Sequence, residues 1–406
     1  MKLSFEDIFA QHLEVLKNEG RYRIFRDISR ERGNFPCALF RYQGDRSQVK
    51  VWCSNDYLAM GENPVVLEAM RSALDQFGAG AGGTRNISGT HGLIVDLEKE
   101  LADLHRKEAA LLFSSGYVAN ETALSVILKL LPNAVVISDS ENHASMIAGI
   151  RASGAQKKIM AHNDPEDLKK ILAEIPQTQP IVLAVESLYS MSGEFGKLKE
   201  LIMLAKERGA FVYVDETHAV GVYGKSGGGV CEELGLLDLV DMLQGGLGKG
   251  FGVVGGFVTG SRNAIDAIRS FGAGFIFTTA LPPVIAAGAL ASVRYLKSSS
   301  LERLKLQEIS SYLKNSLEGA GFPLISNKSH ITPLVIGNAK CCNAISERLL
   351  FENRIYIQPI NYPTVPKGSE RLRITPSPKH TCEDVEELKL ALIGQWEKAH
   401  LSRKAA

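Results

Sequence analysis

Residues 210–218 read Ala-Phe-Val-Tyr-Val-Asp-Glu-Thr-His, a short run of apolar and β-branched residues that ends in a carboxylate. Such a run is typical of a buried strand. Similar runs occur at 134–138, 180–185 and 256–259, and helical patterns lie between them at 144–153, 166–174 and 198–208. Strands that alternate with helices of this length predict an α/β fold with a mainly parallel central sheet and helices on both faces.

The same patterns predict three domains. We expect an N-terminal helical arm at 1–47, a large α/β domain at 48–290 and a smaller C-terminal α+β domain at 291–406. In the arm, Ser4 can cap a helix that Gly20 ends, and the apolar residues of this helix share one face. We expect that face to pack on something larger.

The composition indicates a globular protein without a dominant charge. Lys and Arg number 46 against 45 Asp and Glu, so no overall field favours nucleic acid or an anionic membrane. The six cysteines lack CxxC spacing and histidine partners, which predicts no metal site and a reduced, cytoplasmic protein. Neither a signal segment nor an apolar stretch of membrane-spanning length is evident.

Asp215 directly follows the apolar run at 211–214, so its carboxylate emerges at the edge where parallel sheets bind ligands. A buried carboxylate is costly unless it is paired. A protonated pyridine nitrogen is a suitable partner, because an acid there keeps the ring positive and able to accept electrons. Taken alone, however, an Asp that caps the following turn is the better explanation.

Lys249 lies in Gly245-Gly-Leu-Gly-Lys-Gly-Phe-Gly252, where five glycines surround it. A lysine that forms an imine with an aldehyde needs a closely approaching backbone and a lowered pKa. A glycine-rich turn with a solvated lysine explains this stretch about as well when it is considered alone.

Two more features follow strands. Ser114-Ser-Gly-Tyr117 lies between an apolar run and a helical stretch, and the amides at a helix start suit a phosphate. His143 opens a helix after the run at 134–138, where its ring could stack on a planar ligand; a histidine there is otherwise usually structural. The order phosphate loop, stacking ring, acid and lysine is more specific than any single member.

Longer stretches extend this pattern: Gly20-Arg-Tyr-Arg23, Val51-Trp-Cys-Ser-Asn-Asp-Tyr-Leu58, Gly83-Thr-Arg-Asn-Ile-Ser-Gly89, Asn142-His-Ala-Ser-Met146, Phe275-Ile-Phe-Thr-Thr-Ala-Leu-Pro-Pro283, Gln358-Pro-Ile-Asn-Tyr-Pro-Thr-Val-Pro366 and Arg371-Leu-Arg-Ile-Thr-Pro-Ser377. With them the chain resembles the α-oxoamine synthases, a family of fold-type I pyridoxal-phosphate enzymes, from about residue 19 to beyond residue 378. It is most similar to the members that make 5-aminolevulinate.

The resemblance implies pyridoxal 5'-phosphate as the cofactor of the 48–290 domain. Lys249 would form the imine and transfer protons, Asp215 would contact the pyridine nitrogen, and the catalytic set would include two histidines. Of these, His218 would lie near the phenolic oxygen and His143 would stack on the ring. The other implied cofactor residues are Ser115, Gly116, Tyr117 and Ser190, with Thr278 and Thr279 supplied by the neighbouring subunit of a homodimer.

The resemblance also implies the reaction, a condensation of glycine with succinyl-CoA to 5-aminolevulinate, CoA and CO2. The implied substrate residues are Asn55 and Arg373 for glycine, Arg23, Thr84 and Asn86 for the distal carboxylate of succinyl-CoA, and Thr364. An acyl chain ending in a methyl group would leave the buried Arg23 cation unpaired. The open alternatives are a synthase of 2-amino-3-oxobutyrate or 8-amino-7-oxononanoate, and a non-catalytic protein of the same fold.

Three positions and one stretch depart from the family pattern. Gly246 stands where the family usually has a Thr that helps to bind the phosphate, which predicts weaker cofactor retention unless another group substitutes. Gly250 replaces Ala after the lysine, and Ser192 stands at a position normally held by Asp. The stretch Thr90-His-Gly-Leu-Ile-Val-Asp-Leu97 departs from the family's usual sequence, which places a His near Ile94. None of these changes falls on Lys249, Asp215, Arg373 or Arg23.

Overall fold

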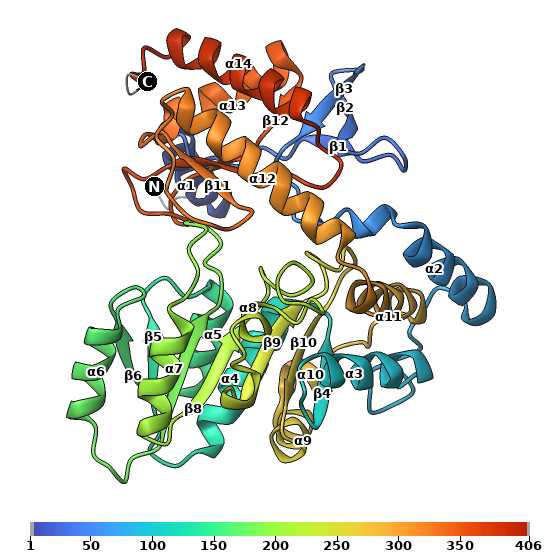
Figure 1. The fold of residues 1–406 in the computed structure, drawn as a ribbon, viewed down its shortest axis with the longest axis vertical. Helices are drawn as coiled ribbons and strands as arrows, with labels where there is room; N and C mark the ends of the chain where they lie inside the picture. Colours follow the sequence, from blue (N-terminus) through green and yellow to red (C-terminus); the bar gives the residue numbers. More distant parts are fainter. Residues whose placement is uncertain (1–3, 404–406) are drawn as a thin grey trace. The chain divides into compact units, whose positions relative to one another are not determined.

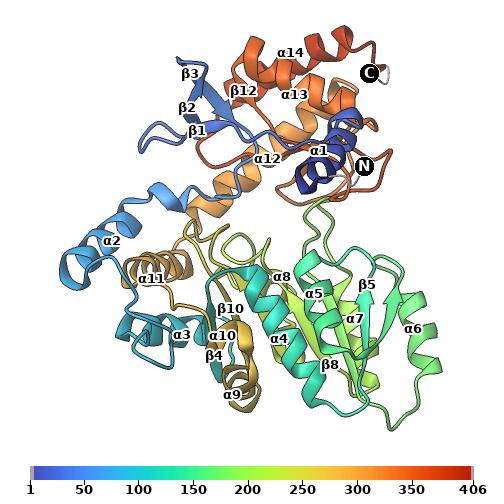
Figure 2. The same cartoon turned by 180° about the vertical axis from the view of Figure 1, so that it is seen from behind.

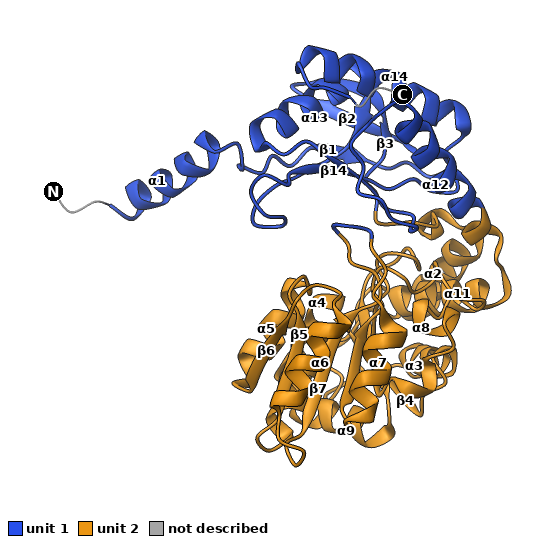
Figure 3. Cartoon of the chain, turned by 60° about the vertical axis from the view of Figure 1, so that its left-hand side comes forward, with its two compact units in different colours: residues 1–54, 191–193, 305–406 blue, residues 55–190, 194–304 orange. Residues whose placement is uncertain are grey.

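The computed structural model describes residues 4–403, which divide into two compact units (Figure 3). Unit 1 consists of residues up to 54 with 191–193 and 305 onwards, and unit 2 consists of residues 55–190 and 194–304. The domain boundaries that the sequence suggests after residues 47 and 290 remain predictions.

A seven-stranded sheet forms the centre of unit 2, in the order β4-β10-β9-β8-β7-β5-β6 (Figure 1). The strands are β4 (Ala109–Phe113), β5 (Val135–Asp139), β6 (Gln156–Met160), β7 (Ile181–Glu186), β8 (Phe211–Asp215), β9 (Met242–Gly246) and β10 (Gly256–Gly260). Neighbouring strands from β6 to β9 pair in parallel, whereas β10 runs antiparallel to both β9 and β4. The predicted α/β fold with a mainly parallel sheet is therefore confirmed.

Helices cover both faces of this sheet. Helix α7 (Leu198–Glu207) lies in front of the sheet in Figure 1, and α4 (Gly116–Leu130) and α5 (Ala144–Ser153) lie in front of it in Figure 2. Ile127 of α4 packs in one buried cluster with Val136 and Val258 of the strands. Burying an aliphatic side chain of this size stabilises the fold by about 1.5–3 kcal/mol. The helical patterns predicted between the strands are thus accounted for.

The remaining helical segments of unit 2 are η1 (Met60–Glu62), α2 (Pro64–Phe77), α3 (Gly92–Leu104), α6 (Pro165–Glu174), α8 (Val230–Glu233), η2 (Leu237–Leu239), α9 (Arg262–Phe271), α10 (Ala273–Ile276) and α11 (Pro283–Ser298). Helix α12 (Leu301–Gly319) begins at the end of unit 2 and continues into unit 1.

Unit 1 has two small sheets of its own. One has the order β1-β2-β3-β12, with β1 (Asp27–Ser29), β2 (Cys37–Tyr42), β3 (Asp45–Val51) and β12 (Ile355–Tyr356). The other has the order β11-β14-β13, with β11 (Thr332–Val335), β14 (Arg371–Ile374) and β13 (Pro359–Ile360). Helices α13 (Ala339–Asn353) and α14 (Cys382–Lys398) pack in the same apolar cluster as Trp52 and Leu372.

The N-terminal helix α1 (Phe5–Asn18) forms as the sequence predicts, with a capping box between Ser4 and Asp7. None of its residues is buried, and Phe5 and Phe9 are 82% and 61% exposed. In Figure 3 the helix extends away from the rest of unit 1. Its apolar face is therefore uncovered in the single chain.

Within residues 4–403, no helix combines the length and apolar character needed to cross a bilayer. The same residues contain no group of three or more His, Cys, Asp or Glu side chains placed to hold a metal ion.

Glu216 anchors the loop that follows β8. Its buried carboxylate accepts hydrogen bonds from Ser187 Oγ at 2.5 Å, Cys231 N at 2.6 Å and Val230 N at 3.0 Å. Burial raises the pKa of Glu216, and these donors act in the opposite direction. These hydrogen bonds fix the loop that follows Asp215.

Replacing Glu216 with Gln should destabilise the protein by about 1–3 kcal/mol, because the new amide group would face backbone N–H donors in a buried site. Thermal unfolding of the purified protein measures the effect. The matched control is Glu174→Gln, which removes only an exposed ion pair to Lys158 and should cost less than ~1 kcal/mol. Equal effects of the two changes would contradict the anchoring role.

Candidate active site

The register of unit 2 aligns three polar residues at the carboxyl edge of the sheet. Asp215 pairs with Glu186 of β7 on one side and with Gln244 of β9 on the other. The loops after these strands continue the alignment, since Ser187 N donates to Asp215 O and Glu216 N donates to Gln244 O. Ligands of parallel sheets bind at this edge.

Asp215 is 4% exposed and lies at the centre of a buried polar network. Its Oδ2 accepts from Asn120 Nδ2 at 2.7 Å, and its Oδ1 accepts from Thr217 N at 2.8 Å. Asn120 in turn accepts from Tyr213 Oη at 2.8 Å and donates to Ser145 Oγ at 3.0 Å. These contacts fix the orientation of the carboxylate without neutralising it.

The glycine-rich turn between β9 and β10 holds Lys249. A Cβ at Gly250 would lie 2.2 Å from Val220 O, so only glycine allows the turn to pack on the loop after β8. A Cβ at Gly245 would lie 2.3 Å from the ring of Phe257. The close backbone approach expected from the sequence is therefore present, and it holds Lys249 beside the loop that carries His218.

His143 caps the start of α5 and keeps its ring exposed. Its Nδ1 accepts from Ser145 N at 3.3 Å and lies 2.7 Å from Ser145 Oγ, and its backbone N donates to Glu186 Oε1 at 2.5 Å. Desolvation by the surrounding chain lowers the pKa of His143; Asp215 opposes this change and Lys249 adds to it. A neutral imidazole with an open face results.

The charges of Asp215 and Lys249 also act on Glu186. Burial raises its pKa well above the ordinary value, Asp215 raises it further, and Lys249 acts in the opposite direction. Lys249 therefore influences the pKa of both Glu186 and His143.

His218 is joined to Asn55 through a buried tyrosine. Tyr57 Oη lies 2.8 Å from His218 Nδ1 and 3.3 Å from Asn55 Oδ1, and Tyr57 is fully buried. Two residues predicted to act on cofactor and substrate are thus linked by one hydroxyl.

The start of α4 carries the predicted phosphate residues. Ser115 is the N-cap, and its side chain accepts from Val118 N at 3.2 Å. Tyr117 is half exposed, and its ring lies edge-on to that of His143 with the centroids 6.4 Å apart. Ser190 follows β7 in the loop that leads away from the same edge.

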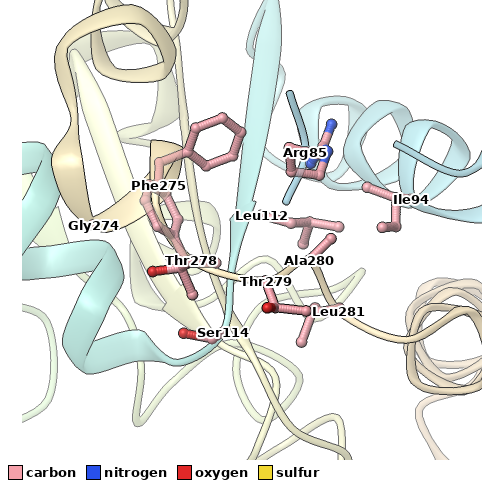
Figure 4. A pocket seen from close by; sticks show the side chains of 11 residues that line it. Arg85, Ile94, Leu112, Ser114, Gly274, Phe275, Thr278, Thr279, Ala280 and Leu281 are labelled. Atoms are coloured by element: carbon pink, nitrogen blue, oxygen red, sulfur yellow. The ribbon is translucent and has the colours of Figure 1, made fainter. Parts of the chain in front are cut away.

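Thr278 and Thr279 line a small cavity of about 20 Å³ together with Ser114 (Figure 4). Thr279 also forms an antiparallel bridge with Thr84, and Ala280 N donates to Gly83 O at 3.0 Å. The segment at 278–280 therefore runs beside the loop that holds Thr84 and the exposed Asn86.

Arg85 anchors that loop. Its guanidinium makes two bonds to Glu98, at 2.7 and 3.0 Å, and lies over the ring of Phe275. A bidentate contact of this kind fixes orientation as well as distance.

The other predicted substrate residues belong to unit 1. Arg373 lies on β14, is 7% exposed, and its charge contributes to the lowered pKa of the buried His330, which is due mainly to burial. Arg23 and Thr364 line one cavity of about 460 Å³ together with Arg21 and Arg26. The single chain leaves Arg23 exposed, in contrast to the buried cation expected from the sequence.

Sequence reasoning missed four residues that shape the site. Asn120 has a signal in retrospect, since it is a polar residue among the mostly apolar buried positions of α4, where it is 1% exposed. Tyr57, Glu186 and Gln244 gave no such signal, because their importance depends on which strands and loops are neighbours.

The donor set suits each part of pyridoxal phosphate. A buried, firmly held carboxylate matches the ring nitrogen, the open imidazole of His143 matches a ring face, Lys249 matches the aldehyde, and the start of α4 matches the phosphate. No part of this set needs a metal ion.

Comparison with known proteins identifies the family of this chain. Residues 47–392 match the aminotransferase class I and II family. The chain is 52% identical over 405 residues to 5-aminolevulinate synthase of Rhizobium meliloti (strain 1021), with 100% of both chains covered. It is also 52% identical over 392 residues to 5-aminolevulinate synthase 1 of Cereibacter sphaeroides, with 96% of each covered.

Among solved structures, Sphingomonas wittichii serine palmitoyltransferase is similar, with a TM-score of 0.89, 28% identity and 98% of each chain covered. The fold and the full-length similarity agree. The chain belongs to the 5-aminolevulinate synthase family, within the fold-type I pyridoxal-phosphate enzymes.

Proposed function

We propose that this chain condenses glycine with succinyl-CoA and releases CO2 and CoA to give 5-aminolevulinate, with pyridoxal phosphate as cofactor. The observation that carries the proposal is the cluster of Asp215, Lys249 and His143 at the carboxyl edge of one parallel sheet. The product is a precursor for heme and other tetrapyrroles.

When bound, pyridoxal phosphate supplies an aldehyde that joins to an amine and a ring that withdraws electrons from the glycine Cα. We assign Asp215 to the ring nitrogen, because a carboxylate held by Asn120 and Thr217 N cannot turn away. The low-dielectric surroundings strengthen its attraction for a proton on that nitrogen.

We assign Lys249 as the base that removes a proton from the glycine Cα. Removal requires a neutral amine. Lys249 lies half-buried in a glycine-rich turn, beside the loop after β8. His218, oriented by Tyr57, would donate a hydrogen bond to the phenolic oxygen. His143 would cover one ring face and exclude water from it.

We assign Asn55 and Arg373 to glycine. The planar guanidinium of Arg373 can hold a carboxylate through two parallel hydrogen bonds, a geometry that lysine cannot copy. The position of Arg373 on a buried strand limits its side-chain freedom. Both residues bind or orient and take no part in proton transfer.

We assign Arg23, Thr84, Asn86 and Thr364 to the distal carboxylate of succinyl-CoA. Arg23 and Thr364 share one cavity, which gives a cation and a hydroxyl for an anionic group. An acetyl or long alkyl chain offers that cation no partner, and such a mismatch discriminates strongly.

We further propose a homodimer with shared sites. Thr278, Thr279, Thr84 and Asn86 lie along one strip of unit 2, so a neighbouring subunit could receive all four together. The uncovered apolar face of α1 offers surface for such contact. Because the six cysteines are unpaired, we propose a cytoplasmic location.

Replacing Lys249 with Ala should lower product formation at least roughly 100-fold, because no other group removes the Cα proton. The assay measures aminolevulinate formed from glycine with succinyl-, acetyl- or longer acyl-CoA, beside the wild type. Undiminished turnover by the variant would contradict the assigned role, and a wild-type preference for acetyl- or pimeloyl-CoA would favour another α-oxoamine synthase.

Replacing Arg23 with Leu should lower kcat/KM for succinyl-CoA relative to acetyl-CoA by roughly 10²–10⁴-fold, because the distal carboxylate loses its cation. Arg21→Leu is the matched control. Arg21 lines the same cavity but is engaged by Glu19 at 2.5 Å and by the ring of Tyr362. An unchanged acyl preference in Arg23→Leu would contradict the assignment.

Shared sites can be tested by mixing subunits. A Lys249→Ala chain is mixed with a chain that carries both Thr278→Val and Thr279→Val. Each of these two variants alone forms a defective homodimer. If the threonines serve the neighbouring site, mixed dimers regain about half of the wild-type activity, because one of their two sites is intact. No recovery in purified mixed dimers would place the threonines in their own subunit's site.

A further inference from the structure

The space beside Gly246 is filled by a side chain from another loop. A Cβ built at Gly246 would lie 2.9 Å from Thr217 Cγ2 and 3.6 Å from Thr217 Oγ1, and its three nearest atoms all belong to Thr217. Gly246 ends β9 in ordinary strand conformation and is not among the glycines with positive φ. Backbone strain therefore does not require glycine here, and the atoms closest to a side chain at this position would be those of Thr217.

The neighbouring glycines show the contrast. Gly245 and Gly250 face a ring and a backbone carbonyl, at 2.3 and 2.2 Å from a built Cβ, so both exclude any side chain. At Gly246 the obstacle is one small side chain, which a substitution can remove. The side chain of Thr217 therefore lies where a side chain of residue 246 would otherwise lie.

The hydroxyl of Thr217 also approaches the start of α4. A Cβ at Gly116, the first residue of that helix, would lie 3.7 Å from Thr217 Oγ1 and 3.2 Å from Gln244 Nε2. Thr217 Oγ1 donates to Gln244 Oε1 at 2.8 Å, while Gln244 Nε2 donates to Gly245 O at 3.0 Å. Gln244 thus holds a half-buried hydroxyl between the end of β9 and the first turn of α4.

We propose that Thr217 replaces the missing side chain of residue 246. Its side chain fills the space beside Gly246, and its hydroxyl donates a hydrogen bond to the phosphate of the cofactor at the start of α4. The inference rests on the proposed function. It explains how a chain without the family's threonine at 246 can still retain pyridoxal phosphate.

The Thr217 hydroxyl has one hydrogen and can donate it to one acceptor at a time. The negative charge of a phosphate makes it a stronger acceptor than Gln244 Oε1. In the structure this hydrogen is donated to Gln244 Oε1, a neutral acceptor. Hydrogen bonds to ionised acceptors are roughly twice as strong as those between neutral groups. Rotation about the Cβ–Oγ bond therefore turns the hydrogen towards a phosphate when one is bound. Thr217 is a positioning residue and takes no part in proton transfer.

The test compares two ligands that differ only in the phosphate. Apoprotein is titrated with pyridoxal 5'-phosphate and with pyridoxal, and the visible absorbance of the bound ligand gives each dissociation constant. Thr217→Val keeps the shape of the side chain but removes the hydroxyl. It should raise the dissociation constant for pyridoxal 5'-phosphate roughly tenfold and change that for pyridoxal by less than about twofold.

A swap of side chains gives the control. Gly246→Thr alone should weaken binding, because its Cβ meets Thr217 Cγ2 at 2.9 Å. Thr217→Ala with Gly246→Thr moves the hydroxyl to residue 246 and should restore the affinity for pyridoxal 5'-phosphate to within about threefold of wild type. Thr217→Ala with Gly246→Ala restores volume without a hydroxyl and should remain weak.

Equal loss of affinity for both ligands in Thr217→Val, no loss for either, or no restoration by the swap would each overturn the inference. These results are distinct from failure of the proposed function. If wild-type protein does not bind pyridoxal 5'-phosphate at all, the proposed function fails, whatever Thr217 does.

Discussion

The buried carboxylate of Asp215 is the constraint on which the rest of the site depends. A carboxylate that is 4% exposed at the end of a parallel strand is costly unless its surroundings are organised around it. Asn120 and the Thr217 amide provide that organisation, and Tyr213 and Ser145 fix Asn120 in turn. Because these donors are neutral, the charge remains available to a cation, and a protonated ring nitrogen is the cation that the neighbouring Lys249 and His143 suggest.

Much of the fold and part of the site could be predicted from the sequence. The apolar runs at 134–138 and 210–214 are local signals and correspond to β5 and β8, and the carboxylate after the second run emerges where expected. The antiparallel insertion of β10 between β4 and β9 could not be foreseen, because strand order depends on pairing between distant segments. The roles of Gln244 and Tyr57 could not be predicted for the same reason, since they depend on neighbours that are distant in the sequence. The exposed face of α1 shows a further limit, since one sequence cannot reveal what covers an apolar face.

Two of the departures from the family pattern, Gly250 and the stretch that contains Ile94, have local physical explanations. Gly250 is required, because any side chain there would meet Val220 O. Ile94 is 1% exposed and lines the small cavity beside Thr278, so an apolar residue fits that place. In unit 1, Ser192 accepts a hydrogen bond from Asn327 at its backbone carbonyl oxygen, and this contact does not account for serine in place of Asp. Gly246 differs from these, because its lost side chain is matched by Thr217 from another loop.

Every assigned role assumes that the amine of residue 249 reaches the cofactor aldehyde while Asp215 holds the ring. The most direct test is reduction of the protein with sodium borohydride in the presence of pyridoxal phosphate, followed by proteolysis and mass spectrometry of the peptides. The structure predicts one pyridoxyl group, on the peptide that contains Lys249. A pyridoxyl group on a different lysine, or on none, would contradict the account.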